Sequence, residues 1–118
     1  MGENKIYNNE HFLEVCLLQL LKEGENYGYR LQEELEAFGY SRESLNPGSL
    51  YRILRGLERR GLVASAWLSG GTGPRRRSYS LTLAGEEALN ERIQMIRDRK
   101  RRIETLLERF GRSPGRDD

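Results

Sequence analysis

The stretch that decides the fold is NPGSLYRILRGLE, residues 46–58. Asn46 is a residue type that caps helix N-termini, and Pro47 is preferred at the first helical position, so this pair predicts the start of a helix. One face of that helix carries only aliphatic side chains, those of Leu50, Ile53, Leu54 and Leu57. The opposite face carries Gly48, Tyr51, Arg52, Arg55 and Arg59. The sequence therefore predicts an amphipathic helix with a buried aliphatic face and an exposed arginine face, ending at Gly61.

Two further helices are expected before this one. In the first, leucines at helical spacing lie within residues 12–21, and the helix is expected to end near Gly24. The second is expected over residues 27–38, with a stripe formed by Tyr27, Leu31, Leu35 and Phe38. Tyr29 can face either way on that helix.

Two short strands are expected after the arginine-rich helix. Residues 62–68 and 78–82 have strand-like composition, and the connection between them is rich in glycine and proline. This pattern predicts a β-hairpin with a long tip, and the tip ends in three consecutive arginines, Arg75, Arg76 and Arg77. Trp67 lies in the first strand and is expected to pack in the hydrophobic core.

From Thr82 to about Phe110 the pattern is that of one long helix, which Thr82 can cap. Its apolar positions follow a heptad seam with one polar interruption at Lys100, and the seam consists of Leu89, Ile93, Ile96, Ile103, Leu107 and Phe110. A stripe on so long a helix is most simply covered by a second chain. We therefore expect a winged-helix unit over residues 1–82, a dimerisation helix over 83–110 and a flexible tail over 111–118.

The charges are unevenly distributed. The whole chain has a net charge of +2, but residues 41–81 contain eight arginines against only Glu43 and Glu58. The first forty residues are acidic, and residues 82–118 are almost neutral. A localised basic segment indicates a surface that binds a polyanion.

Several classes of function are disfavoured. A chain of 118 residues is expected to form one domain, and it has neither an apolar run long enough to span a membrane nor an N-terminal secretion signal. Its single cysteine, Cys16, is expected to pack as a small hydrophobe, and His11 is expected on the surface at a helix start. No metal site, cofactor site or catalytic set emerges, and the glycine tract at residues 70–73 lacks the ending of a phosphate-binding loop. We expect a cytoplasmic, nucleoid-associated protein that is not an enzyme.

Three helices followed by a basic hairpin are the order of a winged helix-turn-helix, a mainly α fold whose third helix enters the DNA major groove. Arg52 and Arg55 are then candidates for base edges, and Arg59 is placed for phosphate. Ser49 and Tyr51 can donate hydroxyls to phosphate. The three hairpin arginines named above would supply the contacts of the wing.

These residues also carry a family resemblance. The segments YGYRL at 27–31, NPGSLYRILRGLE at 46–58, GLV at 61–63 and GTGPRRRSYSLTLAG at 71–85 resemble the PadR family of bacterial transcriptional regulators. Where that family commonly has proline after the recognition-helix tyrosine, this chain has Arg52. The resemblance implies a homodimer that binds an inverted-repeat operator on double-stranded DNA, usually as a repressor. It also implies that a small planar aromatic effector can weaken DNA binding.

Two other functions are compatible with the same residues. One is a winged helix that binds an acidic protein surface rather than DNA, and the other is a small-molecule binding protein whose DNA affinity is incidental. Titration with random duplex DNA at low and high salt separates the first from a DNA-binding protein. An effector that alters operator affinity by linkage separates the second.

Overall fold

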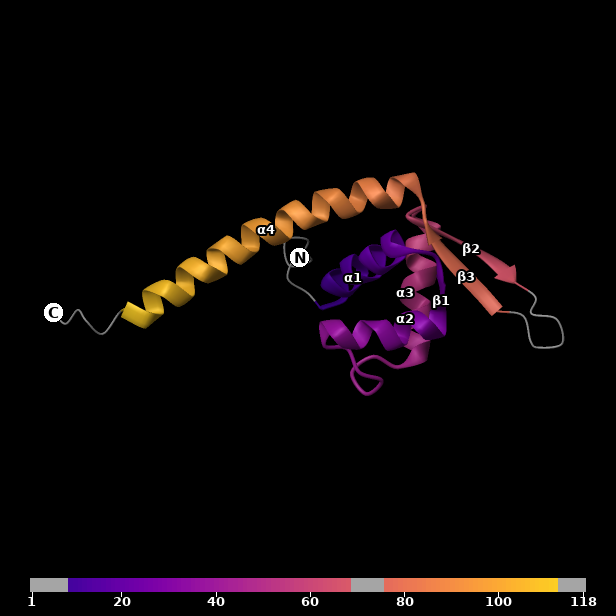
Figure 1. Cartoon of the computed structure of the whole chain (residues 1–118), viewed down its shortest axis with the longest axis horizontal. Coiled ribbons are helices and arrows are strands. Elements are labelled where there is room, and N and C mark those ends of the chain that lie inside the picture. The colour runs from indigo at the N-terminus through magenta and orange to yellow at the C-terminus, as the bar shows by residue number, and fades with distance from the viewer. Residues whose placement is uncertain (1–8, 69–75, 113–118) are drawn as a thin grey trace.

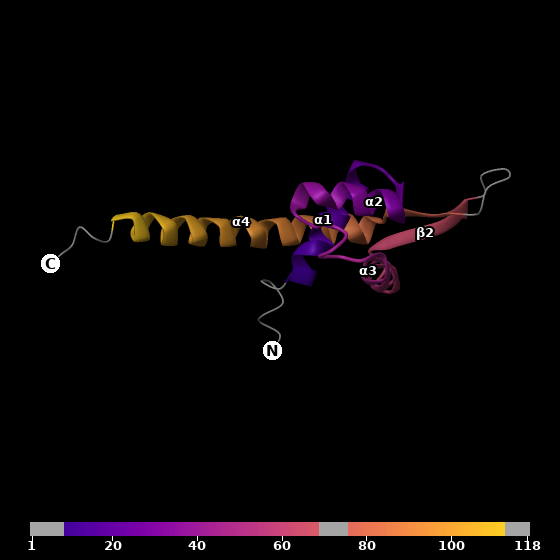
Figure 2. The same cartoon turned by 90° about the horizontal axis from the view of Figure 1, so that it is seen from below.

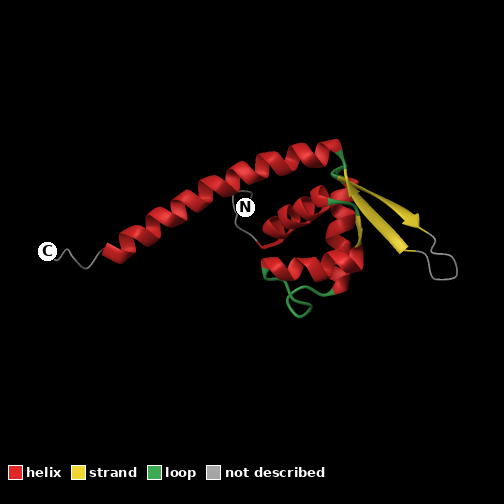
Figure 3. Ribbon diagram, in the orientation of Figure 1, coloured by secondary structure: helices red, strands yellow, loops and turns green. Residues whose placement is uncertain are grey.

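The computed structural model describes residues 9–68 and 76–112, and Figure 1 shows their arrangement. Along the chain the elements are α1 (Asn9–Glu23), β1 (Asn26–Tyr27), α2 (Gly28–Glu34), the 3-10 helix η2 (Leu35–Phe38), α3 (Pro47–Arg59), β2 (Val63–Leu68), β3 (Arg76–Leu81) and α4 (Leu83–Arg112). The fold is mainly helical with one small sheet, as expected. Figure 3 shows the strands at one side of the helical body.

The sheet has three antiparallel strands in the order β1-β3-β2. In the hairpin, Val63 pairs with Leu81 and Leu68 pairs with Arg76, which gives a continuous ladder over both strands. Arg76 and Arg77 therefore lie in β3, and the prediction that they belong to the hairpin tip is wrong. The remainder of that connection, including Arg75, lies outside the described residues.

The predicted helix over residues 27–38 is only partly correct. Tyr27 belongs to the two-residue strand β1, where it pairs with Ser78 of β3, and the helix begins at Gly28. After Glu34 the helix narrows into η2, so the last turn does not continue the expected stripe. Leu31 and Leu35 are fully buried, but Phe38 remains 39% exposed. Strand β1 was not predicted because a strand of two residues is too short to show an alternation of apolar and polar side chains.

The start and the buried face of α3 are confirmed. The side chain of Asn46 accepts a hydrogen bond of 2.9 Å from the backbone N–H of Ser49, and Pro47 occupies the first turn. All four aliphatic residues of the predicted inner face are buried, together with leucines of α1 and α2. Cys16 is buried among them as expected, and burial raises the pKa of its thiol to about 11. His11, in the first turn of α1, is partly buried.

Thr82 joins the hairpin to α4. Its hydroxyl donates to the carbonyl of Gly61 at 2.6 Å and accepts from the N–H of Gly85 at 3.0 Å, so it caps α4 as predicted. A Cβ atom at Gly85 would lie 2.0 Å from the carbonyl oxygen of Leu62, the residue before β2, so this close approach of α4 to the α3–β2 connection requires glycine. These contacts fix where α4 leaves the sheet.

The two halves of α4 have different surroundings. Leu89 is only 1% exposed and belongs to the chain's own core, and Ile93 and Ile96 pack partly against that core. Leu89 is therefore a core residue rather than part of an exposed seam. Farther along, Ile103 and Leu107 are 42% and 62% exposed. Figure 1 shows this second half extending past the helical body, in the direction opposite to the hairpin.

Trp67 differs from its prediction. It is 53% exposed rather than packed in the core, because only the first residue of β2, Val63, is buried beneath the helices. The rest of the hairpin projects away from the body, as Figures 1 and 2 both show. In Figure 2 α3 is seen nearly end-on, beside the start of that hairpin. None of the helices in the described ranges is long and apolar enough to cross a membrane.

Candidate nucleic-acid interface

A cavity of about 500 Å³ lies between the start of α2, the outer face of α3 and the hairpin. We call it the wing groove, and its lining consists of Gly28, Tyr29, Tyr51, Arg55, Trp67, Arg76, Arg77 and Tyr79. Aromatic rings and guanidinium groups thus come together from α2, α3 and both strands of the hairpin. Such a lining suits a planar or anionic partner.

Tyr51 forms a wall of the groove through a close contact with Gly28. A Cβ atom at position 28 would lie 2.4 Å from Cε1 of the Tyr51 ring, so only glycine lets the ring approach the backbone of α2. Tyr51 is half-buried and packs against the core. Its main role in this structure is therefore to position α3 against α2, and its hydroxyl group borders the groove.

Arg55 is the cation that α3 contributes to the wing groove. It is exposed, and no hydrogen bond or ion pair holds its guanidinium within the described ranges. Arg59, one turn farther along α3, is also exposed and likewise has no such partner in residues 9–68 and 76–112. Both guanidinium groups are therefore available to an external anion.

Arg76 is held toward the groove by Tyr29. Its Nη1 donates to the Tyr29 hydroxyl at 2.9 Å, and its Cζ lies 5.2 Å from the centroid of the same ring. Tyr29 in turn stacks on Tyr27, with ring centroids 5.8 Å apart and an interplanar angle of 13°. These contacts orient Arg76 without neutralising it, because a phenol carries no charge at neutral pH.

Arg77 has a different role from its neighbour in β3. Its guanidinium lies 3.5 Å from the carboxylate of Glu58 on α3, and its Nε donates to the hydroxyl of Ser65 at 3.0 Å. The Ser65 hydroxyl donates to the same carboxylate at 2.7 Å, and the Arg77 Cζ lies 5.2 Å from the Trp67 ring. Arg77 is therefore held inside the protein by one hydrogen bond and one ion pair. It joins the wing to α3.

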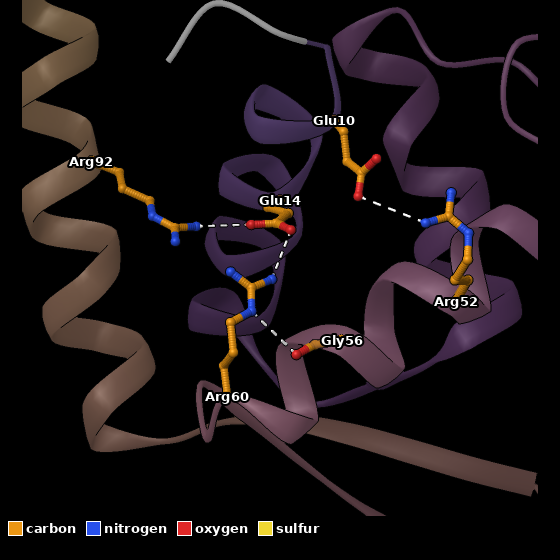
Figure 4. Close-up of polar contacts among 6 residues, drawn as sticks. All are labelled: Glu10, Glu14, Arg52, Gly56, Arg60 and Arg92. Atoms are coloured by element: carbon orange, nitrogen blue, oxygen red, sulfur yellow. Dashed lines mark hydrogen bonds and ion pairs between the residues drawn. The ribbon is translucent and has the colours of Figure 1, made fainter. Parts of the chain in front are cut away.

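Arg52 and Ser49 lie outside the wing groove. They line a second cavity of about 510 Å³ between the start of α3 and α1. The guanidinium of Arg52 is 3.8 Å from the carboxylate of Glu10, a contact drawn in Figure 4. The side chain of Arg52 is 59% exposed and that of Glu10 is 50% exposed. An exposed ion pair of this kind contributes little to stability. Arg52 can therefore exchange Glu10 for another anion at small energetic cost.

Comparison with known proteins settles the family. Residues 17–91, well over half of the chain, match the transcriptional regulator PadR-like family. The chain belongs to this family. The match contains the second half of α1, all of α2 and α3, the described strands and the first turns of α4, so every lining residue of the wing groove lies within the PadR-like region.

Solved structures agree with this assignment. A PadR family regulator from Eggerthella lenta is 32% identical, with a TM-score of 0.70, and 81% of each chain is covered. A PadR family regulator from Clostridium difficile R20291 is 26% identical, with a TM-score of 0.71, over 81% of this chain and 98% of the other. Bacillus subtilis PadR, solved in complex with operator DNA, has the same fold at 24% identity and a TM-score of 0.59, over 67% of this chain and 45% of that one.

The wing groove contains three aromatic residues that the sequence did not predict to lie there, namely Tyr29, Trp67 and Tyr79. Burial raises the pKa of the Tyr79 hydroxyl, with an opposing effect from Arg77, so this group stays protonated at neutral pH. For the groove as a whole, a signal was the Tyr-Gly-Tyr sequence at 27–29, whose glycine leaves room for the ring of Tyr51 from α3. Membership of this family places the chain among regulators of transcription rather than among enzymes.

Proposed function

We propose that this PadR-like regulator binds a palindromic operator as a homodimer, with α3 in the major groove and the wing on the adjacent backbone. The observation that carries the proposal is the convergence of Arg55 from α3 and Arg76 from β3 on one groove. Neither guanidinium is paired with a carboxylate among the described residues. A duplex supplies phosphates on both sides of the major groove, which is the arrangement that two such cations require.

The arginines then divide into two roles, contact with base edges and contact with the phosphate backbone. Arg55 is placed to reach a base edge, where a bidentate contact with guanine is the most common specific pairing. Arg76 and Arg59 are placed for phosphates, because they flank Arg55 on the wing and on the last turn of α3. Arg52 joins the base-reading set once it leaves Glu10, and Arg75 extends the wing contact as an expectation from the sequence alone.

The proposed dimer uses the second half of α4. We call its exposed apolar residues the distal stripe, and they are Ile103, Leu106, Leu107 and Phe110. They recur at three- and four-residue steps, the spacing by which two helices pack along a seam. A second copy is the partner that fits best, because a palindromic operator needs two recognition helices related by a two-fold axis. Ile93 and Ile96 continue this stripe toward the core.

We further propose that the dimer represses transcription by occupying its operator, and that a small planar aromatic ligand releases it. Both parts rest on the family resemblance. Trp67, the only tryptophan of the chain, is exposed in the wing groove beside Arg77 and offers a reporter for each step. Its emission should change when operator DNA is added and return when a releasing ligand is added.

Titration with duplex DNA tests the proposal. A random-sequence duplex should bind with an affinity that falls steeply with salt, because each neutralised phosphate releases about one counterion. Arg55→Ala should reduce affinity for a selected operator by about 1–3 kcal/mol and relax its sequence preference. Arg102→Ala, which removes an exposed arginine of α4, is the matched control and should leave both unchanged. Salt-independent binding, or tighter binding to an acidic protein than to DNA, would contradict DNA recognition.

A further inference from the structure

One carboxylate joins three helices in this fold. Glu14 of α1 is the only charged residue that is buried within the described part of the chain, and its side chain is 11% exposed. Its Oε2 accepts a hydrogen bond of 2.7 Å from Arg60, and its Oε1 accepts one of 3.2 Å from Arg92. Figure 4 shows Glu14 between these two arginines. We call the three residues the Glu14 cluster.

The two arginines come from the elements that matter for operator binding. Arg60 is the C-terminal cap residue of α3, and its Nε also donates to the carbonyl of Gly56 at 3.3 Å. Its guanidinium is thereby fixed to the end of the recognition helix. Arg92 lies on α4, on the turn after the core residue Leu89, and its side chain is 18% exposed. Glu14 thus holds the end of α3 and the beginning of the proposed dimerisation helix at one point.

A buried carboxylate of this kind restricts geometry more than it adds stability. Removing it from water has a large desolvation penalty, which is offset only while both arginines keep their positions. Any rotation of α3 relative to α4 that lengthens either hydrogen bond leaves a buried charge poorly compensated, and the free energy rises steeply. Apolar packing alone, as at Leu89, tolerates small rotations because it is not directional.

We infer that Glu14 is a positioning residue. By fixing α3 relative to α4, it determines which distance between operator half-sites the dimer can bind. The inference rests on the proposed function. In a dimer joined through α4, the angle between α3 and α4 determines how far apart the two recognition helices lie and how they face the duplex. Inserting one base pair moves a half-site about 3.4 Å along the axis and rotates it by about 35°. A fixed angle therefore gives a sharp spacing preference.

The test measures binding to a set of palindromic duplexes. They carry one half-site obtained by selection and differ only in spacing, from two base pairs fewer to two more. For the unmodified protein, affinity should fall about tenfold or more for the first step away from the best spacing. Glu14→Gln keeps the shape but leaves one arginine without an acceptor. For this variant, the same step should reduce affinity less than about threefold.

Two further variants make the result decisive. Glu86→Gln breaks the exposed pair between Lys22 and Glu86, 3.3 Å apart, which joins α1 to α4 without involving α3. This control should keep the steep fall of affinity with half-site spacing that the unmodified protein shows. The double variant Glu14→Met with Arg92→Met leaves no buried charge unpaired, so it should fold even where Glu14→Gln does not. Its affinity should change little with half-site spacing.

Each outcome has a stated meaning. Because the readout is a ratio within one variant, a general loss of stability or affinity does not change it. Sharp profiles for both Glu14 variants would overturn the inference and leave the proposed function standing. A flat profile for Glu86→Gln as well would show general loosening between α1 and α4, and it would also overturn the role of Glu14. An unmodified protein that binds no palindrome at any spacing would overturn the proposed function together with this inference.

Discussion

The guanidinium of Arg77 lies 3.5 Å from the carboxylate of Glu58 and so joins strand β3 of the hairpin to α3. Ser65 completes the contact by bonding to both side chains. Arg76, the preceding residue, bonds instead to the uncharged Tyr29. The two adjacent arginines therefore have different roles. Arg77 makes contacts within the protein, and Arg76 remains available to an external partner.

We expect Arg77→Ala and Arg76→Ala to separate stability from binding. Removing Arg77 leaves the partly buried Glu58 without its cation, so the free energy of unfolding should fall by about 1–3 kcal/mol, the range for a polar group that loses its partner. Removing Arg76 should change stability by less than about 0.5 kcal/mol, as for an ordinary surface residue, and should reduce the salt dependence of DNA binding by about one phosphate contact. Urea unfolding and anisotropy titrations at several salt concentrations measure these quantities. Equal losses of stability in the two variants would show that the difference in their contacts has no energetic importance.

Two glycine substitutions should have opposite signs. Gly28→Ala places a Cβ atom 2.4 Å from the Tyr51 ring, so the ring must move and stability should fall by about 1–3 kcal/mol. Gly56→Ala meets only an arginine side-chain nitrogen at 3.8 Å, so the better helix propensity of alanine should raise stability by about 0.5–1 kcal/mol. Thermal unfolding of both variants checks this pair. A Gly28→Ala protein as stable as the original would mean that Tyr51 does not depend on its contact with α2.

The buried thiol predicts a pH dependence. Because burial raises the pKa of Cys16 from 9.0 to about 11, its contribution to stability is complete below pH 9 and is lost as the pH rises toward 11. The unfolded chain releases this proton first, and that favours unfolding. The stability difference between the original protein and Cys16→Ala should therefore shrink over this interval, as measured by urea unfolding at each pH. A constant difference from pH 8 to 11 would be inconsistent with a thiol buried in the native state.

The sequence was sufficient for the parts of the fold that local rules determine. The cap at Asn46, the inner face of α3 and the cap at Thr82 follow from side chains that act on their own backbone, and each was predicted to the residue. The arginine face of α3 could be predicted for the same reason, because helical periodicity fixes which residues share a face.

Contacts between distant segments could not be predicted. Whether Trp67 is covered depends on how far the hairpin projects beyond α3, which no local pattern encodes. The separate roles of Arg76 and Arg77 depend on Tyr29 and Glu58, which lie far away in the sequence or on another element. Leu89 and Ile103 follow one heptad pattern, yet Leu89 is buried in the core and Ile103 is exposed, because α4 is longer than the body it packs against.

A charge placed in the distal stripe should separate dimerisation from folding. Leu107 is 62% exposed in the single chain, so Leu107→Asp should leave the fold intact and destabilise only an interface with a second copy. We expect a monomer in sedimentation, with operator affinity much lower than that of the dimer because only one half-site is bound at a time. Glu104→Gln, on the same turn and also exposed, is the control for general effects of substitution on α4. A Leu107→Asp protein that still sediments as a dimer would remove the distal stripe from the interface.

Selection of bound duplexes from a random library, with the unmodified protein, tests the central claim most directly, since it reports DNA binding, sequence preference and two-fold symmetry together. We expect enrichment of a palindrome whose half-sites are centred about one helical turn of DNA apart, or a multiple of it. No enrichment over the starting library, or enrichment of a site without two-fold symmetry, would contradict the claim that two copies present their α3 arginines to one operator.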